Sequence, residues 1–393
     1  MEERTISTVP SWLSDGFLKM VISREDCNVD IISSKVETYS ESETNKPCST
    51  YRVTVESLTN GHKEKNSLLI KSTTDNSKIN QNENSLTREI NAYTLLVLPM
   101  QKILEKLQLQ FAPKLYFARS GPDEVLVHED LEATDYRQAV PSSGCDMKTC
   151  ILVTRKLAQF HASSVVLNQT HPDVMTSFKF STYSQESVER LQNVFPPVLR
   201  KLAKQVETWP EYRERFAVKL HNLANSAVDK ICECVTTIKN DFNVLCHEEL
   251  CLQNILFGYS EHAAEIDEVR FFNYGSVHWG SPVVDFYRFL HSCAAPDVLE
   301  WSQILAEEYY FVLEDTLNRL GYHQLCPSIA HFYNQLEKRV HFGLILGLVD
   351  RAIMLSDNYP IPCVENYADV EFSDRYKNVV KKILLVLQTK GWI

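Results

Sequence analysis

The sequence has no long hydrophobic run. No stretch reaches the roughly 18 uninterrupted apolar residues that a membrane-spanning helix needs, and the best candidate, residues 341–355, is broken by Asp350 and Arg351. The first residues carry acidic side chains and lack the apolar core of about 7–15 residues that a signal peptide requires. We therefore expect a cytoplasmic protein without a membrane span.

Clustered basic residues are also absent. The 393-residue chain has 40 Lys and Arg against 51 Asp and Glu, which gives a formal net charge of −11, and it contains no basic tract. Because a phosphate backbone is bound mainly through clustered Lys and Arg, this charge argues against a nucleic-acid partner. A composition of 44% hydrophobic and 23% charged residues is that of an ordinary soluble globular protein, and the length predicts two domains or lobes.

The eleven cysteines follow neither a disulfide framework nor a zinc motif. Their number is odd and their spacing does not repeat, so we expect reduced thiols. Cys232 with Cys234, and Cys246 with His247 and Cys251, are residue types that bind zinc, but neither group has a second pair at finger-like spacing. Ordinary buried or partly buried thiols are the favoured interpretation, and we expect no zinc.

The stretch from residue 244 to residue 290 combines a polar loop with two short apolar runs. The runs, residues 255–257 and 269–272, are joined by a polar segment, and this pattern predicts a β-hairpin. Asn254 precedes the first run and Asn273 follows the second. Several oxygen and nitrogen ligands could therefore converge on one spot.

The spacing of polar residues in this stretch is typical of a kinase. Such a phosphotransferase needs a base for the attacking hydroxyl, an amide oxygen five residues later, and a further metal ligand after the next hairpin, because Mg²⁺ ions hold the transition-state charge. Glu249, Asn254 and Asn273 occupy these places, and His247 lies in the same loop. Short motifs also arise by chance, so a solvated turn with a capping histidine is the alternative that spacing alone leaves open.

The N-terminal part predicts a sheet with helices beside it. Residues 11–20 have helical spacing of apolar side chains, whereas residues 29–37, 49–58, 111–118 and 124–127 have the pattern of strands. A further apolar strand, residues 67–71, ends in Lys71, which could present an ammonium to the phosphates of a nucleotide. A lysine on the surface at a strand end is the alternative.

The remainder of the chain predicts mainly helices. A helix starts at Ser85 and carries Glu89 and Tyr93 one turn apart. Further helices are expected over residues 150–164, 187–206, 211–238, 298–320, 329–356 and 373–389. His161, in the first of these, is interpreted as a satisfied core histidine rather than a catalyst.

Several of these motifs resemble the choline-kinase-like and aminoglycoside-kinase-like group, and most closely the insect ecdysteroid kinase-like family. The loop of that family runs His-Gly-Asp-Leu-Trp-x-Asn-Asn, which residues 247–254 resemble. The other similar segments are the Tyr-Arg-Val strand at 51–53, Glu-(three residues)-Tyr at 89–93, Glu-Asp-Leu at 129–131, Leu-Ala-x-Phe-His-Ala at 157–162, Gly-Ser-Pro-x-x-Asp at 280–285 and the C-terminal residues 391–393. The resemblance covers essentially the whole chain.

The resemblance implies an α+β, bilobal protein-kinase-like fold. Residues 1–127 would form an N-terminal lobe with an antiparallel sheet and one helix, and residues 128–131 would form the hinge segment. Residues 132–393 would form a mainly helical C-terminal lobe. ATP with Mg²⁺ would be expected in the cleft of such a fold.

The resemblance also implies roles for individual residues. Lys71 would hold phosphates and Glu89 would orient Lys71. Nucleotide contacts would come from Asn45 in the phosphate-covering turn and from the hinge residues His128, Glu129, Asp130 and Leu131. Glu249 would accept the hydroxyl proton, with His247 and Asn254 beside it in the catalytic loop. Metal would be held by Asn254 and Asn273, and Asp285 would support the loop by accepting hydrogen bonds from its backbone.

The chain departs from the family pattern at several of these positions. Glu248 replaces a glycine, Glu249 an aspartate, Cys251 a tryptophan, Gln253 an asparagine and Asn273 the metal-binding aspartate, while Glu43 and Cys48 replace the glycine and serine of the turn. Two functions stay open. One is an ATP-dependent kinase that phosphorylates a hydroxyl of a steroid-like or other lipophilic alcohol, and the other is a pseudokinase that binds ligands or regulates without phosphoryl transfer.

Overall fold

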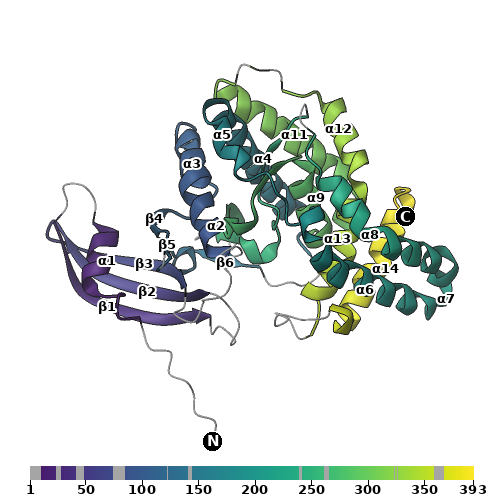
Figure 1. Cartoon of the computed structure of the whole chain (residues 1–393), viewed down its shortest axis with the longest axis horizontal. Coiled ribbons are helices and arrows are strands. Elements are labelled where there is room, and N and C mark those ends of the chain that lie inside the picture. The colour runs from purple at the N-terminus through teal and green to yellow at the C-terminus, as the bar shows by residue number, and fades with distance from the viewer. Residues whose placement is uncertain are drawn as a thin grey trace, which may run out of the picture. The chain divides into compact units, whose positions relative to one another are not determined.

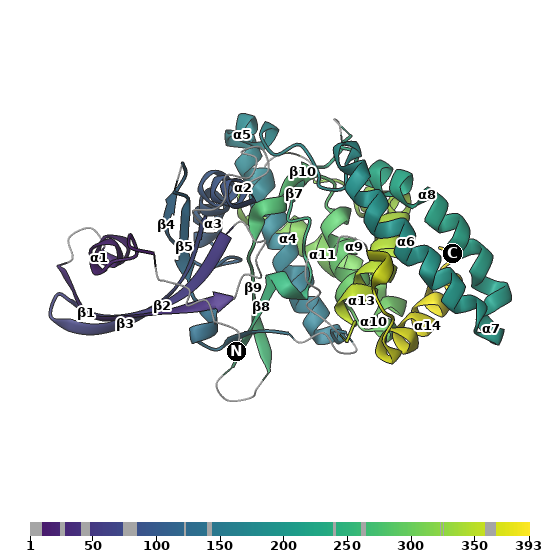
Figure 2. The same ribbon diagram turned by 60° about the horizontal axis from the view of Figure 1, so that its bottom comes forward.

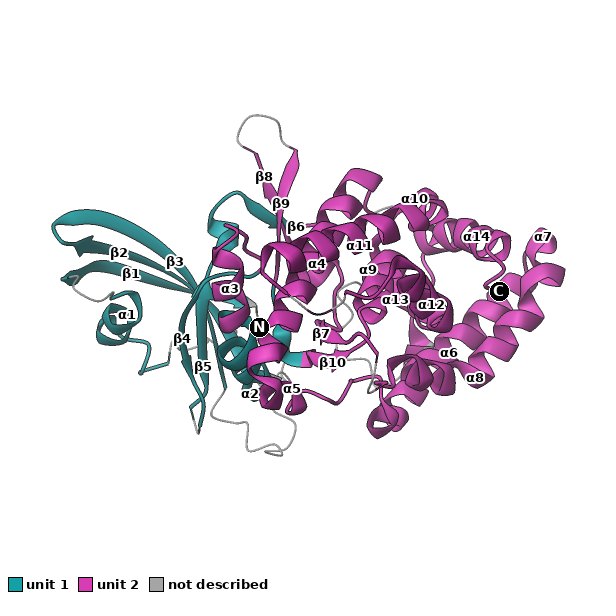
Figure 3. Cartoon of the chain, turned by 90° about the horizontal axis from the view of Figure 1, so that it is seen from above, with its two compact units in different colours: residues 1–98, 112–137, 272–275 teal, residues 99–111, 138–271, 276–393 magenta. Residues whose placement is uncertain are grey.

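The computed structural model describes two compact units of the chain. The described residues are 10–23, 28–40, 48–73, 85–121, 123–139, 144–238, 241–260, 265–322, 324, 326–357 and 367–393. Unit 1 is Met1–Leu98, Ala112–Arg137 and Phe272–Gly275, and unit 2 is Pro99–Phe111, Gln138–Phe271 and Ser276–Ile393, as coloured in Figure 3. Asn45 and Glu43, in the expected phosphate-covering turn, lie outside the described residues.

Unit 1 is built on a five-stranded antiparallel sheet (Figure 1). Its strands are β1 (Val29–Ser40), β2 (Cys48–Thr59), β3 (His62–Thr73), β4 (Leu115–Arg119) and β5 (Val125–Glu129), in the order β1-β2-β3-β5-β4. Every neighbouring pair is antiparallel, so the predicted antiparallel sheet is confirmed. A short strand β6 (Tyr136–Gln138) follows a 3₁₀ turn at Leu131–Ala133.

Alternation along the strands gives the sheet one apolar face. Tyr51, Val53 and Val55 of β2 are buried together with Leu68 and Ile70 of β3, because side chains two apart on a strand point to the same face. The helix α1 (Asp15–Ile22) covers this apolar core (Figure 2). Unit 1 therefore has its own hydrophobic core.

The hairpin between β2 and β3 is longer than the sequence analysis predicted. The strand expected over residues 67–71 begins at His62, directly after a two-residue turn at Asn60 and Gly61. Both turn residues have positive φ, 51° and 83°, as the tight turn of an Asn-Gly hairpin requires. The added length, residues 62–66, is polar and largely exposed, so it carries no hydrophobic alternation that would have predicted a strand.

Residues 85–105 form one continuous helical segment with an irregular middle. It comprises α2 (Ser85–Ala92), a π-helical turn at Tyr93–Val97 and α3 (Leu98–Glu105). The hydroxyl-bearing ring of Tyr93 is fully buried where the π-helical turn begins. The predicted helix with Glu89 and Tyr93 is confirmed.

Unit 2 is mainly helical, as predicted. Its helices after α3 are α4 (Met147–Thr170), α5 (Pro172–Thr176), α6 (Val188–Glu207), α7 (Pro210–Tyr212), α8 (Val218–Val235), α9 (Val283–Cys293), α10 (Pro296–Glu300), α11 (Ser302–Arg319), α12 (Ile329–Lys338), α13 (Val340–Met354) and α14 (Asp374–Thr389). Within the unit, α4 packs on α11, α9 on α13, and α6 lies beside α8. Two segments predicted as single helices are each two helices, because the chain leaves helical geometry at Trp301 and at Arg339.

One short strand precedes the polar loop of unit 2 (residues 247–254) in sequence, and three short strands follow it. The predicted hairpin is confirmed as β8 (Ile255–Tyr259) and β9 (Ile266–Phe271), with Ile255 opposite Phe271. The strands β7 (Val244–Cys246) and β10 (His278–Gly280) pair in antiparallel fashion with Cys246 opposite His278. Three residues are too few for a sequence pattern to predict the β7–β10 pairing.

Within the part of the chain that the structure describes, no helix is both long enough and apolar enough to cross a membrane. The nine described cysteines are all free.

Candidate active site

Lys71 and Glu89 meet in unit 1. Leu68 and Ile70 of β3 point into the core, so Lys71 points to the other face of the sheet, where α2 presents Glu89. The Lys71 Nζ atom donates to both carboxylate oxygens of Glu89, at 2.8 Å and 2.9 Å. The side chains are only 12% and 9% exposed, so this ion pair is shielded from solvent.

Asn273 joins the same ion pair. Its Oδ1 accepts a hydrogen bond from Lys71 Nζ at 2.5 Å, and residues 272–275 belong to unit 1. The backbone of Asn273 has φ of 64°, a left-handed conformation that asparagine adopts more readily than most residues. The next residue, Tyr274, is buried with its ring edge-on to Tyr93 at 5.2 Å. Lys71 is therefore bound by one carboxylate and one neutral amide.

His128, in the expected hinge segment of residues 128–131, is buried and neutral. Its ring stacks on Tyr93 with centroids 6.2 Å apart, and Nδ1 lies 3.1 Å from the carbonyl oxygen of Glu129. Burial, reinforced by the charge of Lys71, lowers the pKa of His128 to about 4. At neutral pH the ring therefore contributes packing and no charge.

Asp130 of the hinge segment is turned toward the sheet by Arg52. Its carboxylate accepts from Arg52 Nε at 2.6 Å and Nη2 at 3.1 Å, and from Ser67 Oγ at 2.7 Å. Arg52 also donates to Glu132, and its guanidinium lies over the ring of Tyr39. Burial works against the charged guanidinium, but the two carboxylates raise the pKa of Arg52.

The backbone of the hinge segment is also partly bonded within unit 1. The N–H of Glu129 donates to the carbonyl oxygen of Lys114, and that of Asp130 donates to the carbonyl oxygen of Ser67. Leu131 is buried. The segment is thus fixed to the sheet through its backbone.

In unit 2, Asp285 holds the start of the polar loop. This residue lies in the first turn of α9, and its carboxylate accepts from the backbone N–H of His247 at 2.5 Å and of Glu248 at 2.7 Å. The carboxylate is fully buried, which opposes its charge, but the hydrogen bond from His161 and the surrounding donors outweigh burial and lower the pKa of Asp285. A buried anion here is stabilised by three N–H donors.

His161 is a satisfied core histidine, so this prediction is confirmed. Its Nε2 lies 3.1 Å from Asp285, and its Nδ1 lies 2.6 Å from the hydroxyl of Tyr309. Burial lowers the pKa of His161 despite the neighbouring carboxylate. The neutral ring therefore donates to Asp285 and accepts from Tyr309.

The remaining loop residues differ in exposure. The ring of His247 is fully buried edge-on to Phe271, and its backbone N–H serves the loop through Asp285. Glu249 is half-buried, and the side-chain N–H₂ of Asn254 donates to its carbonyl oxygen at 2.8 Å. This bond closes the loop between the candidate base and the candidate metal ligand.

Two features of the site were not found by sequence reasoning. Arg52 lies in the Tyr-Arg-Val segment, and its partners are 78 and 80 residues away in sequence. Glu248 has φ of 69° and is fully buried, although a left-handed backbone costs a non-glycine residue roughly 1–2 kcal/mol. The glycine that the family has at this position was the signal that the backbone is special there.

The predicted metal ligands do not fit a Mg²⁺ site built by the protein alone. Asn254 and Asn273 are both neutral, and the Asn273 oxygen is bonded to an ammonium. Proteins hold Mg²⁺ through one or two carboxylates together with substrate phosphates. Across the described ranges, no group of three or more His, Cys, Asp and Glu side chains could hold a metal ion.

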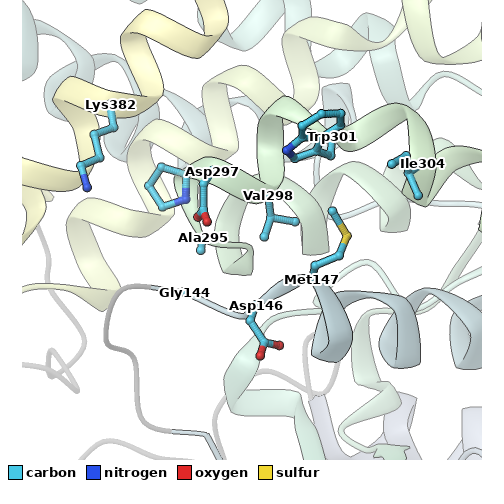
Figure 4. A pocket seen from close by; sticks show the side chains of 10 residues that line it. Gly144, Asp146, Met147, Ala295, Asp297, Val298, Trp301, Ile304 and Lys382 are labelled. Carbon is cyan, nitrogen blue, oxygen red and sulfur yellow. The ribbon is translucent and has the colours of Figure 1, made fainter.

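A hollow of about 730 Å³ lies elsewhere on unit 2. It is lined by residues of α10 and by Asp146, Met147, Trp301 and Lys382 (Figure 4). None of the predicted site residues lines it. The hollow is therefore separate from the candidate site residues.

The antiparallel sheet of unit 1, the mainly helical unit 2 and these motifs together define a kinase-like phosphotransferase fold of the α+β class. The sequence matches the ecdysteroid kinase-like family over residues 48–322, and the chain belongs to that family. Comparison with curated proteins gives no match.

Three similar solved structures are, by name, one phosphotransferase and two kinases. A spectinomycin phosphotransferase, crystallised with ADP and spectinomycin, has 12% identity and a TM-score of 0.44, covering 93% of this chain and 94% of its own. Choline kinase from Cryptosporidium parvum has 12% identity and a TM-score of 0.44, covering 95% and 93%. A microcompartment-associated aminopropanol kinase has 9% identity and a TM-score of 0.35, covering 96% and 97%.

Replacing Asp285 by asparagine should destabilise the protein. We expect Asp285→Asn to lower the free energy of unfolding by about 2–4 kcal/mol, because hydrogen bonds to a buried charge are lost and an N–H₂ group would face an N–H donor. Urea denaturation followed by tryptophan fluorescence measures this change. Asp374→Asn, at a carboxylate that is 94% exposed, is the control and should change stability by less than about 0.5 kcal/mol.

The pH dependence of this difference follows from the lowered pKa of Asp285. A carboxyl group whose folded pKa is below its ordinary value of 3.8 contributes fully above that value, and the contribution is lost as pH falls through the folded pKa. The difference between parent and Asp285→Asn should therefore stay constant from neutral pH down to about 5 and shrink only below about 3.8. Equal stability of the two proteins at neutral pH would contradict the role given to Asp285.

Proposed function

We propose that the chain is an ATP-dependent kinase that phosphorylates a hydroxyl group of a small molecule. The observation that carries the proposal is the ion pair between Lys71 and Glu89, with both carboxylate oxygens within 2.9 Å of the ammonium. Kinases need this pairing of a strand lysine with a helix glutamate, since it sets the lysine against the nucleotide phosphates. Residues 1–127 would cover the nucleotide, residues 128–131 would meet the adenine, and residues 132–393 would carry the acceptor.

In this proposal Glu249 is the base of the reaction. Its carboxylate would take the proton of the acceptor hydroxyl as the hydroxyl oxygen forms a bond to the γ-phosphorus of ATP and the bond to the leaving ADP oxygen breaks. The loop geometry supports this role, because Asp285 and Asn254 fix the backbone on both sides of Glu249. Glutamate places its carboxylate one methylene farther out than aspartate, and a misplacement of about 1 Å can cost about 10²-fold in rate.

Binding of nucleotide would rest mainly on Lys71. The ammonium supplies positive charge to the phosphates, while Asn273 offers a neutral oxygen where the family has an aspartate. Asn254 would help to hold the loop against the phosphates. Since Asn254 and Asn273 do not fit a Mg²⁺ site, the roles proposed for the protein's own residues do not depend on a bound metal ion.

The acceptor would be a steroid-like or other lipophilic alcohol. Membership of the ecdysteroid kinase-like family supports this class of substrate. The hydroxyl must be unhindered enough to reach Glu249, which is half-buried.

A pseudokinase is the second candidate function, and Asn273 is the observation that favours it. A neutral amide, already hydrogen-bonded to Lys71, stands where phosphoryl transfer normally relies on an anionic metal ligand. Such a protein would keep nucleotide or ligand binding and act as a regulator. The two candidates differ in catalysis and agree on binding.

ATP should stabilise the protein with little dependence on Mg²⁺. At a concentration about ten times the Kd, binding adds about 1.4 kcal/mol to the free energy of unfolding and should raise Tm by about 2 °C. Differential scanning fluorimetry with and without Mg²⁺ measures this, and Lys71→Ala should remove the shift. Absence of any shift at about millimolar ATP would rule out both the kinase and a nucleotide-binding pseudokinase.

The two candidate functions separate in the double variant Glu249→Asp with Asn273→Asp. The pair restores the reach of the base and an anionic metal ligand, and both act on one transition state, so their effects should be non-additive. The assay is transfer of the γ-phosphate of ATP to a panel of hydroxysteroids and amphipathic alcohols. We expect transfer by the parent and a gain of about 10-fold or more in the double variant.

The controls of this assay are Lys71→Ala and Glu249→Ala, which should abolish transfer by the parent. An inactive parent with an active double variant would establish the pseudokinase instead. If both proteins bind ATP and neither transfers phosphate, the roles given to Glu249 and Asn273 are wrong for this panel.

A further inference from the structure

Glu248 occupies a position that disfavours it on two grounds. Only four described residues other than glycine have positive φ, and Glu248 is one of them, with φ of 69°. Its side chain is fully buried, although a charged group away from water is unfavourable unless it is bonded. A glutamate in this place must therefore be held by specific partners.

The carboxylate of Glu248 has two hydrogen-bond donors and one neighbouring imidazole inside unit 2. Ser181 Oγ donates to Oε1, and the backbone N–H of Thr182 donates to Oε2 at 2.8 Å. His278 Nδ1 lies 3.3 Å from Oε1, and this ring is also fully buried. The partners come from the segment after α5 and from β10, so one side chain connects the loop to two other parts of the unit.

The turn that receives the carboxylate is itself well fixed. Ser181 Oγ accepts from the N–H of Tyr183 at 3.0 Å, and the Ser181 carbonyl oxygen accepts from the Ser184 hydroxyl at 2.7 Å. The ring of Tyr183 packs edge-on to Phe342 of α13 with centroids 5.4 Å apart. Because the turn of residues 181–184 is anchored in the helical core, it can hold the loop in place.

The backbone of Glu248 is fixed from the other side. Its N–H donates to Asp285 Oδ1 at 2.7 Å, and Asp285 belongs to α9. The residue is therefore held at its N–H by one helix and at its carboxylate by the turn of residues 181–184. These two attachments determine φ and ψ of Glu248, and hence the direction in which the chain continues to Glu249. A glycine would adopt the same φ at no cost but would offer no second attachment.

We propose that Glu248 is a positioning residue, which ties the loop to the turn of residues 181–184 and so fixes the place of Glu249. The proposal rests on the proposed function, because Glu249 is its candidate base. Glu248 itself touches neither nucleotide nor acceptor in this scheme. Where a glycine would leave the backbone free to move, Glu248 provides a fixed link between the loop and the turn of residues 181–184.

Glu248→Gly tests the tie directly, since glycine keeps the backbone conformation and removes the anchor. We expect amide hydrogen exchange in residues 247–254 to become at least about tenfold faster, while exchange in α4 and α11 stays unchanged. Ser181→Ala removes one donor and leaves Glu248 in place, so a smaller acceleration should appear in the same residues. Ser163→Ala, which removes a buried hydroxyl of α4 that donates to the Phe160 carbonyl oxygen one turn away, is the matched control and should change nothing in the loop.

The kinetic readout separates positioning from general stability. In an active parent, Glu248→Gly should lower kcat at least about tenfold with KM for ATP within about twofold, and Glu248→Gln should recover part of kcat because its amide oxygen still accepts from the turn. Unchanged exchange in the loop of Glu248→Gly would overturn the proposal, as would faster exchange with an unchanged kcat.

The two proposals fail in different ways. If the parent transfers no phosphate to any acceptor, the proposed kinase function fails, while faster exchange confined to residues 247–254 and 181–184 still supports the tie. If Glu248→Gly does not fold, the exchange of Ser181→Ala decides, and a loop as protected as in Ser163→Ala overturns the proposal.

Discussion

The polar loop of unit 2 depends on one buried carboxylate. Asp285 binds two consecutive backbone N–H groups of the loop and the ring of His161, so α4, α9 and the loop share a single anionic centre. Such a group is costly to bury alone and stabilising only when all its donors are present. The candidate base, the closing bond from Asn254 and the tie through Glu248 all begin from the backbone that this carboxylate fixes.

Much of the fold could be predicted from the sequence, because local patterns determine it. Alternating burial on β2, the apolar end of β3 before Lys71 and the runs that form β8 and β9 are each visible within a few residues. Lys71 with Glu89, 18 residues apart, required the family resemblance, since nothing in the intervening sequence indicates that the two side chains meet. The Asn60-Gly61 turn was a local signal that predicts the full length of the hairpin.

The rest of the candidate site could not be predicted, because its partners are distant in sequence. Arg52 finds Asp130 at a separation of 78 residues, and Glu248 finds Ser181 at 67. A serine in a turn or an arginine on a strand has many equivalent partners until the chain is folded. The departures from the family pattern were visible in the sequence, but only the structure shows that Glu248 is bonded where a glycine was expected.

The short strand β10 limits how this loop can change over evolution. A Cβ atom on Gly280 would lie 2.6 Å from Nε2 of His278, so the buried imidazole beside Glu248 occupies the space that the glycine leaves empty. In a relative with glycine at the place of Glu248, this imidazole would lose the carboxylate beside it. Glu248 and His278 should therefore vary together among homologues, because a change at Glu248 alone would leave a buried ring without its partner, and a residue larger than glycine at position 280 would clash with that ring.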